Sequence, residues 1–509
     1  MVTSVVQYMD DIVKKFPEKI AYVDENVSVT FNEFGKLAKC IGSCILQHTS
    51  PQMPVVVYME KGVYNLTAFL GVASAGCFYV PIDSQMPQER MNIILDKLSP
   101  AIIIYDKTTE KKLSKLVSNA VFIPYESACQ TIYDDYKLEE VAQNICNTDL
   151  LYVFFTSGST GIPKGVAISH GALIDFIEWI CDEYQLGEHT KFCNQVPFYF
   201  DVSVPDIYVP LKVGATTYIP PKSYYTFPKE ILSYIDERNI NTILWVPSAL
   251  CNVVNCQALE ICCPQSLSLI MFCGEVMPCK HLNVWIAKLP KALYVNLYGP
   301  TESTCASMYY NVTRPFNDDD TLPLGKACRN TRILLLDEKG NPVGNGEIGE
   351  ICILGQGLSQ GYFNDIEKTQ KVFVQNPTNH YYPELMYKTG DLALLVNGEM
   401  KFAGRKDFQI KRLGHRIELG EIENVVNSIN EIENACCLYE EEESKIYVFY
   451  VGNINKTNLR KYIREKLPRY MLPNEFVELE RMPINLNGKT DRVKLKKEFI
   501  NVMKEGGNI

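Results

Sequence analysis

One stretch near residue 150 constrains this chain of 509 residues more than any other. Residues 150–155 are an apolar run with the length and β-rich composition of a buried strand. The next ten residues concentrate glycines, hydroxyl residues and one lysine, namely Thr156, Ser157, Gly158, Ser159, Thr160, Gly161 and Lys164. Glycines let a backbone fold closely around an anion, and hydroxyls and an ammonium add donors and charge. The stretch therefore predicts a phosphate-binding loop that follows a buried strand.

The loop differs from the Walker A loop, because Lys164 is followed by Gly165 and no helix is expected to begin there. Taken alone, the loop also fits a flexible Ser/Gly turn on the surface. The rest of the chain has to decide between these interpretations.

Composition narrows the class of protein. The net charge of −10 argues against general nucleic-acid binding, which depends on an excess of Lys and Arg. No apolar run reaches about 18 residues, and the first residues lack a signal-peptide pattern, so we expect a cytoplasmic protein without membrane insertion. The 18 cysteines are scattered and form no C-x-x-C pair, so we expect neither a metal–thiolate site nor a structural disulfide.

Short apolar runs alternate with helical patterns through the first 300 residues, which predicts an α/β fold with parallel sheets covered by helices. One such helix is expected over residues 31–47 with Asn32 as its cap, and strands are expected at 191–196, 215–219, 242–246, 267–272 and 293–297. After about residue 318, short strands and turn signals indicate a β-rich subdomain, with strands expected at 333–337, 349–354, 392–396 and 400–402.

The pattern of the last hundred residues predicts a compact α+β unit, with helices at 421–430 and 456–466 and strands at 435–439 and 446–451. We therefore predict a large N-terminal domain, residues 1–403, and a small, mobile C-terminal domain, residues 404–509.

Six motifs occur along the chain in a fixed order: Thr156-Ser-Gly-Ser-Thr-Gly-Ile-Pro-Lys-Gly-Val166, Tyr298-Gly-Pro-Thr-Glu302, Tyr387-Lys-Thr-Gly-Asp391, Gly404-Arg-Lys-Asp407, Gly414-His-Arg-Ile-Glu-Leu-Gly-Glu-Ile-Glu423 and Asn487-Gly-Lys-Thr-Asp-Arg492. The set resembles the signature motifs of the adenylate-forming superfamily over residues 65–492. Through Phe200-Asp-Val-Ser203 and Phe272-Cys-Gly-Glu-Val276, the chain is similar to amino-acid adenylation domains of nonribosomal peptide synthetases and to stand-alone D-alanyl carrier protein ligases.

The resemblance implies a reaction in which a carboxylate attacks the α-phosphate of ATP and displaces pyrophosphate. Positioning and positive charge dominate such a step. The loop at 156–165, with Lys164, is then expected to hold the β- and γ-phosphates, and Lys489 to bridge the carboxylate and the α-phosphate. Thr301 and Glu302 are expected at the α-phosphate, with Glu302 holding Mg²⁺.

The same resemblance places the nucleoside. Asp391 is expected to accept hydrogen bonds from the ribose hydroxyls, with Arg405 nearby. Adenine is expected between the Gly274-Glu275 backbone and the strand end at Asn296, Tyr298 and Gly299, where Tyr298 supplies a ring face.

By resemblance, Asp201 pairs with the α-ammonium of an amino acid. The rest of that pocket is expected to be apolar and medium-sized, lined by Val202, Pro205, Leu244, Met271, Cys273, Leu297, Cys305 and Ala306. Cys273 is similar to the D-alanine enzymes, whereas Pro205 and Leu297 depart from their pattern. D-alanine is therefore the first candidate substrate, and another neutral amino acid in a stand-alone peptide-synthetase enzyme is the alternative.

We expect the acyl group to pass to the phosphopantetheine thiol of a separate carrier protein, since the chain ends just after the Lys489 motif. Asp407 is expected to be the hinge that lets the small domain move between the two half-reactions. An acyl-CoA synthetase and a non-catalytic scaffold are the rival functions. Asp201 argues against the first, and the intact Lys164, Glu302, Asp391 and Lys489 argue against the second.

Overall fold

The computed structural model describes residues 2–158, 162–441, 443–484 and 490–500. The chain separates into two compact units. The first consists of Met1–Ser84, Leu95–Phe155 and Gly165–Lys406, and the second of Gln85–Ile94, Thr156–Lys164 and Asp407–Ile509. The predicted division into residues 1–403 and 404–509 stays a prediction.

Within the described residues, the first unit contains a nine-stranded sheet with the order β15-β14-β13-β12-β11-β9-β10-β1-β2. Its strands are β1 (Ile20–Val23), β2 (Ser28–Thr30), β9 (Lys191–Cys193), β10 (Thr216–Tyr218), β11 (Thr242–Trp245), β12 (Leu269–Cys273), β13 (Leu293–Tyr298), β14 (Met308–Asn311) and β15 (Lys326–Ala327). The strands from β1 to β13 along this order pair in parallel, as predicted.

The strands at both edges of this sheet pair in the antiparallel direction, whereas the sequence predicted parallel strands only. Only residues 299–307 separate β13 from β14. A connection this short cannot hold a helical crossover, so the chain turns back beside the strand it has just left. The tight return passes through the Tyr298–Glu302 motif.

A second sheet of the first unit has the order β6-β5-β3-β4-β7-β8. Its strands are β3 (Pro54–Tyr58), β4 (Phe78–Pro81), β5 (Ile102–Tyr105), β6 (Val121–Pro124), β7 (Leu150–Thr156) and β8 (Lys164–Ser169). The run at 150–155 is therefore the buried strand β7, as its composition predicted.

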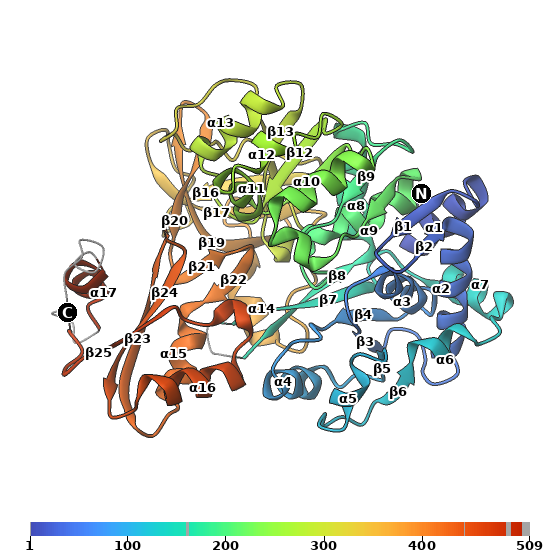
Figure 1. The fold of residues 1–509 in the computed structure, drawn as a ribbon, viewed down its shortest axis with the longest axis horizontal. Helices are drawn as coiled ribbons and strands as arrows, with labels where there is room; N and C mark the ends of the chain where they lie inside the picture. Colours follow the sequence, from blue (N-terminus) through green and yellow to red (C-terminus); the bar gives the residue numbers. More distant parts are fainter. Residues whose placement is uncertain (1, 159–161, 442, 485–489, 501–509) are drawn as a thin grey trace. The chain divides into compact units, whose positions relative to one another are not determined.

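Helices pack on both sheets. A large core joins side chains of both sheets to α1 (Val5–Lys15), α2 (Phe31–Ile45), α3 (Val63–Ser74), α8 (His170–Glu183) and α9 (Val204–Val213). A second core lies under α10 (Pro228–Glu237), α11 (Pro247–Asn255) and α13 (Cys279–Lys288), which lie together near β12 and β13 (Figure 1). The remaining helices up to residue 372 are α4 (Gln88–Leu98), α5 (Glu110–Leu113), α6 (Tyr125–Cys129), α7 (Asp135–Asn144), α12 (Ala258–Ile261) and α14 (Ile366–Val372).

The cap of α2 is Thr30, and the expected cap Asn32 lies within the helix. The Thr30 hydroxyl accepts from the backbone N–H of Glu33 at 3.2 Å, and the Glu33 carboxylate accepts from the backbone N–H of Thr30 at 2.8 Å. This reciprocal pair satisfies donors that an α-helix leaves open at its start, so it decides where the helix begins.

The β-rich subdomain of the first unit contains β16 (Thr331–Leu336), β17 (Ile348–Gly355), β18 (Phe373–Gln375), β19 (Leu385–Val396) and β20 (Glu399–Arg405). All of their pairings are antiparallel. Strand β19 begins before the Tyr387–Asp391 motif, where the sequence predicted a strand only from residue 392. The motif adopts a β-strand conformation because its residues pair with β17, β18 and β20.

The second unit contains a hairpin, β21 (Gln409–Arg412) and β22 (His415–Glu418), and a sheet with the order β23-β24-β25. The sheet strands are β23 (Ile432–Glu440), β24 (Lys445–Gly452) and β25 (Glu475–Glu478), and the helices include α15 (Leu419–Asn427), α16 (Lys456–Lys466) and α17 (Arg492–Leu495). The fold class is confirmed: sheets covered by helices with a β-rich subdomain, and a smaller α+β unit. Across the described chain, no helix combines the length and apolarity that a membrane crossing requires.

Candidate active site

The carboxyl end of β13 leads into a turn with strict steric limits. A Cβ atom on Gly299 would lie 2.5 Å from the Cys305 carbonyl oxygen, so only glycine fits there. Thr304 and Cys305 both adopt positive φ, at 55° and 69°. Such backbone is uncommon outside glycine and often marks a functional turn.

Asp391, in β19, sits between two donors of the first unit. The Tyr298 hydroxyl donates to Asp391 Oδ2 at 2.7 Å, and Arg405 forms an ion pair with Oδ1. The pairing of β19 with β20 sets Asp391 opposite Arg405 in the sheet. Burial, and then the charge of Asp391, raise the pKa of Tyr298 well above its ordinary value, so the phenol stays protonated and donates.

This arrangement brings together three residues that the sequence assigned to the nucleoside. The Asp391 side chain is 3 % exposed and the Arg405 side chain 10 %, so the ion pair lies in a medium of low polarity. Tyr298 is also buried, and its ring belongs to a small core with Met308 and Leu324. Its expected role as a ring face for adenine stays a prediction.

Glu302 follows in a short 3-10 turn, η3 (Thr301–Ser303), and is fully buried. Its Oε1 accepts from the Tyr362 hydroxyl at 2.8 Å, and its backbone carbonyl accepts from the Ser359 N–H at 2.9 Å. The carboxylate is thus oriented by a neutral donor. No sequence motif marks Tyr362, which lies 60 positions from Glu302 along the chain.

The residues expected around adenine are held by hydrogen bonds of their own. Glu275 Oε2 accepts from the Ser248 backbone N–H at 3.0 Å, at the start of α11. The Asn296 side chain donates to the Pro323 carbonyl at 2.9 Å. Gly274, directly after β12, has a φ of 98°, where other residues are strained. The Glu275 and Asn296 side chains are thus held by hydrogen bonds within the first unit.

The residues expected in the amino-acid pocket come from three neighbouring strands, two turns and the start of α9. Leu244 lies beside Met271, and Cys273 beside Leu297, in the parallel sheet. Apart from Asp201 and Pro205, the predicted pocket residues share the large core, namely Val202, Leu244, Met271, Cys273, Leu297, Cys305 and Ala306. Pro205 is also buried, at the start of α9.

Asp201 begins the 3-10 turn η1 (Asp201–Ser203) and is only 8 % exposed. The Cys273 thiol donates to the Cys305 carbonyl at 3.9 Å, which links the two cysteines predicted to shape the pocket. The hydrogen bond with Cys273, then burial and nearby charge including Asp201, raise the pKa of the Cys305 thiol. Both cysteines lie in the large core, where they act as small hydrophobes.

Tyr152, in β7, is a further buried side chain that the sequence did not single out. Its hydroxyl has no hydrogen-bond partner among the described residues. Burial, and after it the charge of Asp201, raise its pKa well above the ordinary value. Tyr152 lies in an apolar run, and the sequence of such a run does not distinguish a tyrosine of the core from a tyrosine near a binding site.

Of the predicted phosphate loop at 156–165, the segment Thr156–Lys164 is assigned to the second unit, and residues Ser159, Thr160 and Gly161 lie outside the described part. The Ser157 hydroxyl donates to the Arg416 carbonyl at 2.8 Å, and a Cβ on Gly158 would lie 2.2 Å from the Ile162 carbonyl oxygen. Lys164 is 9 % exposed at the start of β8. The role of this loop in phosphate binding stays a prediction.

Lys489 also lies outside the described residues. On either side of residues 485–489, Ile484 and Thr490 form an antiparallel bridge, and the Asp491 N–H donates to the Pro483 carbonyl at 2.8 Å. Asp407 is the first residue of the long C-terminal segment of the second unit. Its role as a hinge stays a prediction.

Comparison with known protein families matches two descriptions. Residues 9–363 match "AMP-binding enzyme", and residues 421–489 match "AMP-binding enzyme C-terminal domain". A D-alanine--D-alanyl carrier protein ligase of Listeria monocytogenes serovar 1/2a is 32 % identical, over 98 % of this chain and 99 % of the relative. Tyrocidine synthase 1 of Brevibacillus parabrevis is 32 % identical, over 96 % of this chain and 44 % of the relative.

Solved structures agree with this match. The crystal structure of IdnL1 has a TM-score of 0.81 at 25 % identity, over 95 % of this chain and 99 % of the other. The Vibrio cholerae adenylation domain AlmE, solved with glycyl-adenosine-5'-phosphate, has a TM-score of 0.85 at 21 % identity, over 98 % of both chains. The second similarity concerns the fold alone.

Proposed function

Because the chain belongs to the AMP-binding enzyme family, we propose that it uses ATP to activate a small or medium apolar amino acid as an acyl-adenylate. The acyl group then passes to the phosphopantetheine thiol of a separate carrier protein. The nearly full-length similarity to ligases that charge a carrier protein supports both halves of this proposal.

In the first half-reaction, a carboxylate oxygen of the amino acid attacks the α-phosphorus, and the bond to pyrophosphate breaks. Two anions must converge, so positioning and neutralisation of charge dominate. We assign Lys164 and the loop at 156–165 to the β- and γ-phosphates. Lys489 is assigned to the approach of the carboxylate to the α-phosphate, and Thr301 is assigned to the α-phosphate.

Asp391 is assigned to the ribose hydroxyls. One of its oxygens accepts from Tyr298 and the other from Arg405. A carboxylate has about four lone-pair sites, so both oxygens can accept further hydrogen bonds. A carboxylate already held by two donors loses little conformational freedom when it binds.

Glu302 is assigned to Mg²⁺, which prefers oxygen ligands and is commonly held by one or two carboxylates together with substrate phosphates. The residues present fit this role. The Glu302 carboxylate is buried beside the Thr301 turn, and Tyr362 orients it through a neutral hydroxyl that adds no competing charge. Bound Mg²⁺ would neutralise charge on the phosphates.

The observation that most favours an amino acid as the substrate is the burial of Asp201 at the edge of an apolar core. A surrounding of low polarity strengthens the attraction between this carboxylate and a substrate ammonium. A fatty acid or an aryl acid carries no ammonium, which disfavours an acyl-CoA synthetase. The other pocket side chains carry no charge, which suits a neutral substrate side chain.

D-alanine is the first candidate, supported by the relatives named D-alanine--D-alanyl carrier protein ligase and by Cys273. A stand-alone peptide-synthetase enzyme for another neutral amino acid is the second candidate. It is supported by the similarity to tyrocidine synthase 1 and by Pro205 and Leu297. In either case the carrier's thiolate attacks the acyl carbonyl, and AMP leaves.

The test is ATP–pyrophosphate exchange with D-alanine, L-alanine, glycine, larger neutral amino acids and a fatty acid. We expect exchange with one or a few neutral amino acids and none with the fatty acid. Exchange driven only by the fatty acid would establish an acyl-CoA synthetase. A folded chain that supports no exchange with any acid would establish a non-catalytic role.

A further inference from the structure

A pair of buried side chains closes the segment that carries Asp201 into a loop. Asn194 follows β9 directly and Asp206 lies in α9, so Asp201 is near the middle of the segment 194–206. The Asn194 side chain donates from Nδ2 to Asp206 Oδ2 at 2.7 Å, and both side chains are fully buried. We call this pair the Asn194–Asp206 clasp. It joins the two ends of the segment that contains Asp201.

Backbone hydrogen bonds anchor both residues of the clasp in the first unit. The Asn194 N–H donates to the Tyr218 carbonyl at 2.9 Å, and the Asn194 carbonyl accepts from the Tyr225 hydroxyl at 2.8 Å. The Asp206 carbonyl accepts from the Thr217 hydroxyl at 2.6 Å. The two ends of the segment are therefore fixed independently of the clasp, and the clasp holds them to each other.

The clasp contains two buried oxygen atoms that lack a donor. Among the described residues, neither Asp206 Oδ1 nor Asn194 Oδ1 has a hydrogen-bond partner. Buried acceptors without a donor are costly and uncommon in native folds. A carboxyl and an amide that share one N–H···O bond can form a second bond beside it when the carboxyl carries a proton. One proton on Asp206 Oδ1, donated to Asn194 Oδ1, gives both oxygen atoms a partner.

The surroundings of Asp206 favour the protonated form. Burial raises the pKa of Asp206 to about 7, although the hydrogen bond with Asn194 and then the charge of Lys61 lower it. Three titratable side chains interact with Asp206, namely Lys61, Cys193 and Tyr225. Burial raises the pKa of the Cys193 thiol to about 12 and the pKa of Tyr225 well above its ordinary value. Of these three, only Lys61 is therefore charged near neutral pH.

Lys61 contacts the same segment at other atoms. Its Nζ donates to the Gln195 carbonyl at 3.3 Å and lies 5.4 Å from the centre of the Phe198 ring. Asp206 Oδ2 accepts from Asn194, and Oδ1 has no hydrogen-bond partner among the described residues. Lys61 therefore does not supply the donor that Oδ1 lacks, and a proton on the carboxyl itself remains the donor nearest to hand.

We infer that Asp206 is a positioning residue: its neutral carboxyl donates from Oδ1 to Asn194 Oδ1 and so holds the segment that carries Asp201 for the substrate ammonium. This inference rests on the proposed function, in which Asp201 binds the α-ammonium. Asp201 and Asp206 are the two acidic residues of the segment 194–206. With Asp206 neutral, Asp201 is the one anion of the segment that the ammonium meets, so the two carboxyls have separate roles.

The test compares two variants of Asp206 in ATP–pyrophosphate exchange, with the amino acid that the wild-type chain activates. In Asp206→Asn, an amide can make both hydrogen bonds with Asn194, so we expect KM values for the amino acid and for ATP within about twofold of wild type. Asp206→Leu has a similar size and makes neither bond. We expect its KM for the amino acid to rise at least about tenfold and its KM for ATP to stay within about threefold.

Asp175→Leu is the matched control for Asp206→Leu. Asp175, in α8, also accepts from an asparagine side chain, that of Asn330, but it lies outside the segment 194–206. We expect both KM values of this variant within about twofold of wild type, because exposed substitutions away from a site change little.

The pH dependence of stability gives a second readout. The folded pKa of Asp206 is raised from 3.8 to about 7, so the contribution of the protonated form is complete below pH 3.8 and is lost as the pH rises to about 7. The urea midpoint of Asp206→Asn, followed by tryptophan fluorescence, should therefore rise relative to wild type between about pH 5 and pH 7.

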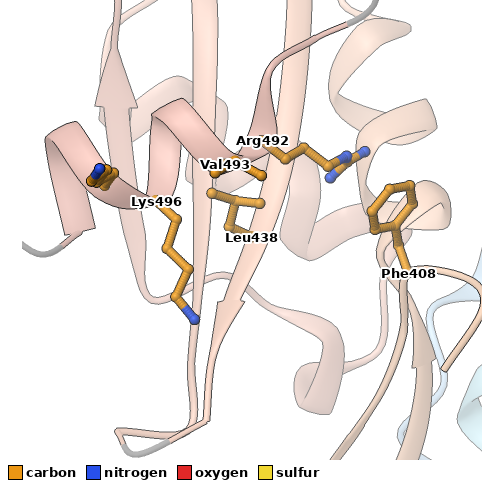
Figure 2. Close-up of a pocket in the computed structure, with 6 residues that line it drawn as sticks. Phe408, Leu438, Arg492, Val493 and Lys496 are labelled. Carbon is orange, nitrogen blue, oxygen red and sulfur yellow. The ribbon is translucent and has the colours of Figure 1, made fainter. Parts of the chain in front are cut away.

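A change at Lys61 tests the same proton from outside the clasp. Lys61→Met should move the end of the pH-dependent change to higher pH, because burial and then Asn194 and the charge of Lys61 set the pKa of Asp206. Lys496→Met is the control. Lys496 forms an ion pair with Glu440 at 3.4 Å and lines a cavity of about 400 Å³ in the second unit (Figure 2). It should leave the pH dependence of the first unit unchanged.

Three results would overturn the inference. If Asp206→Asn raises the KM for the amino acid as much as Asp206→Leu, the carboxyl acts as an anion. Equal rises of both KM values in Asp206→Leu mark a residue that only supports the fold. A difference in urea midpoint between Asp206→Asn and wild type that does not change with pH shows that Asp206 carries no proton.

The remaining outcomes are also decisive. If Asp206→Leu does not fold, the KM values of Asp206→Asn and the urea midpoints decide. A wild-type chain that supports no exchange refutes the proposed function and the positioning role with it, while the urea titrations still test the protonated clasp. An active wild-type chain with any of the three contrary results refutes only this inference.

Discussion

Removing the Tyr298 hydroxyl gives a direct test of the Asp391 site. In Tyr298→Phe, Asp391 keeps Arg405 but loses a 2.7 Å hydrogen bond in a buried position. A hydrogen bond to a charged group contributes about 1.5–3 kcal/mol. We expect the free energy of unfolding to fall by that amount. Arg405→Met should cost more, about 3–5 kcal/mol, because it leaves a buried carboxylate without its counter-charge.

The assay can be confined to the relevant part of the chain. The three tryptophans, Trp179, Trp245 and Trp285, all lie in the first unit, so their fluorescence in a urea titration follows the unit that contains Tyr298. Tyr310→Phe is the matched control. The Tyr310 hydroxyl accepts from an exposed Arg314 at 3.2 Å, and its loss should cost no more than about 0.5 kcal/mol.

The same variant tests function. If Asp391 binds the ribose, a loosened carboxylate should raise the KM for ATP by about tenfold, which corresponds to about 1.4 kcal/mol. The KM for the amino acid should stay near wild type. Equal stability losses in Tyr298→Phe and Tyr310→Phe would refute the energetic reasoning. A large stability loss with an unchanged KM for ATP would instead refute the ribose assignment.

Four other predictions concern single residues. Burial lowers the pKa of His170 from 6.5 to about 4, so its contribution to the free energy of unfolding, about 3 kcal/mol, is complete above pH 6.5 and is lost as the pH falls toward 4. His170→Asn should flatten this part of the curve of unfolding free energy against pH. An unchanged slope would show that other groups cause the pH dependence. Asp201→Asn should weaken amino-acid binding by about 2–5 kcal/mol, measured as KM, with little change for ATP; equal losses for both substrates would mark a structural aspartate. Lys489→Ala should abolish acyl-adenylate formation and retain thioester formation from supplied acyl-adenylate, and a failed rescue in a folded variant contradicts its assigned role. Asp407→Pro, which fixes φ near −65°, should slow thioester formation far more than adenylation, and rates that fall together would exclude a hinge there.

Local sequence patterns determined most of the elements. The helix predicted at 456–466 is α16 with the same bounds, and the strands predicted at 242–246 and 293–297 are β11 and β13 within one residue at each end. Such patterns reflect contacts between near neighbours along the chain, so they can be read without the fold. The ordered motifs likewise identified the superfamily, because each motif is a contiguous segment.

Tertiary structure decided how the site residues are held. Asp391 meets Tyr298 across 93 positions, Glu302 meets Tyr362 across 60, and Arg492 stacks on Phe408 from the far end of its unit. The extension of β19 through its motif also depends on β17 and β18, which pair with it. These features depend on contacts between residues well separated in the chain. Local periodicity and propensity carry no record of such contacts, so only the folded chain could show them.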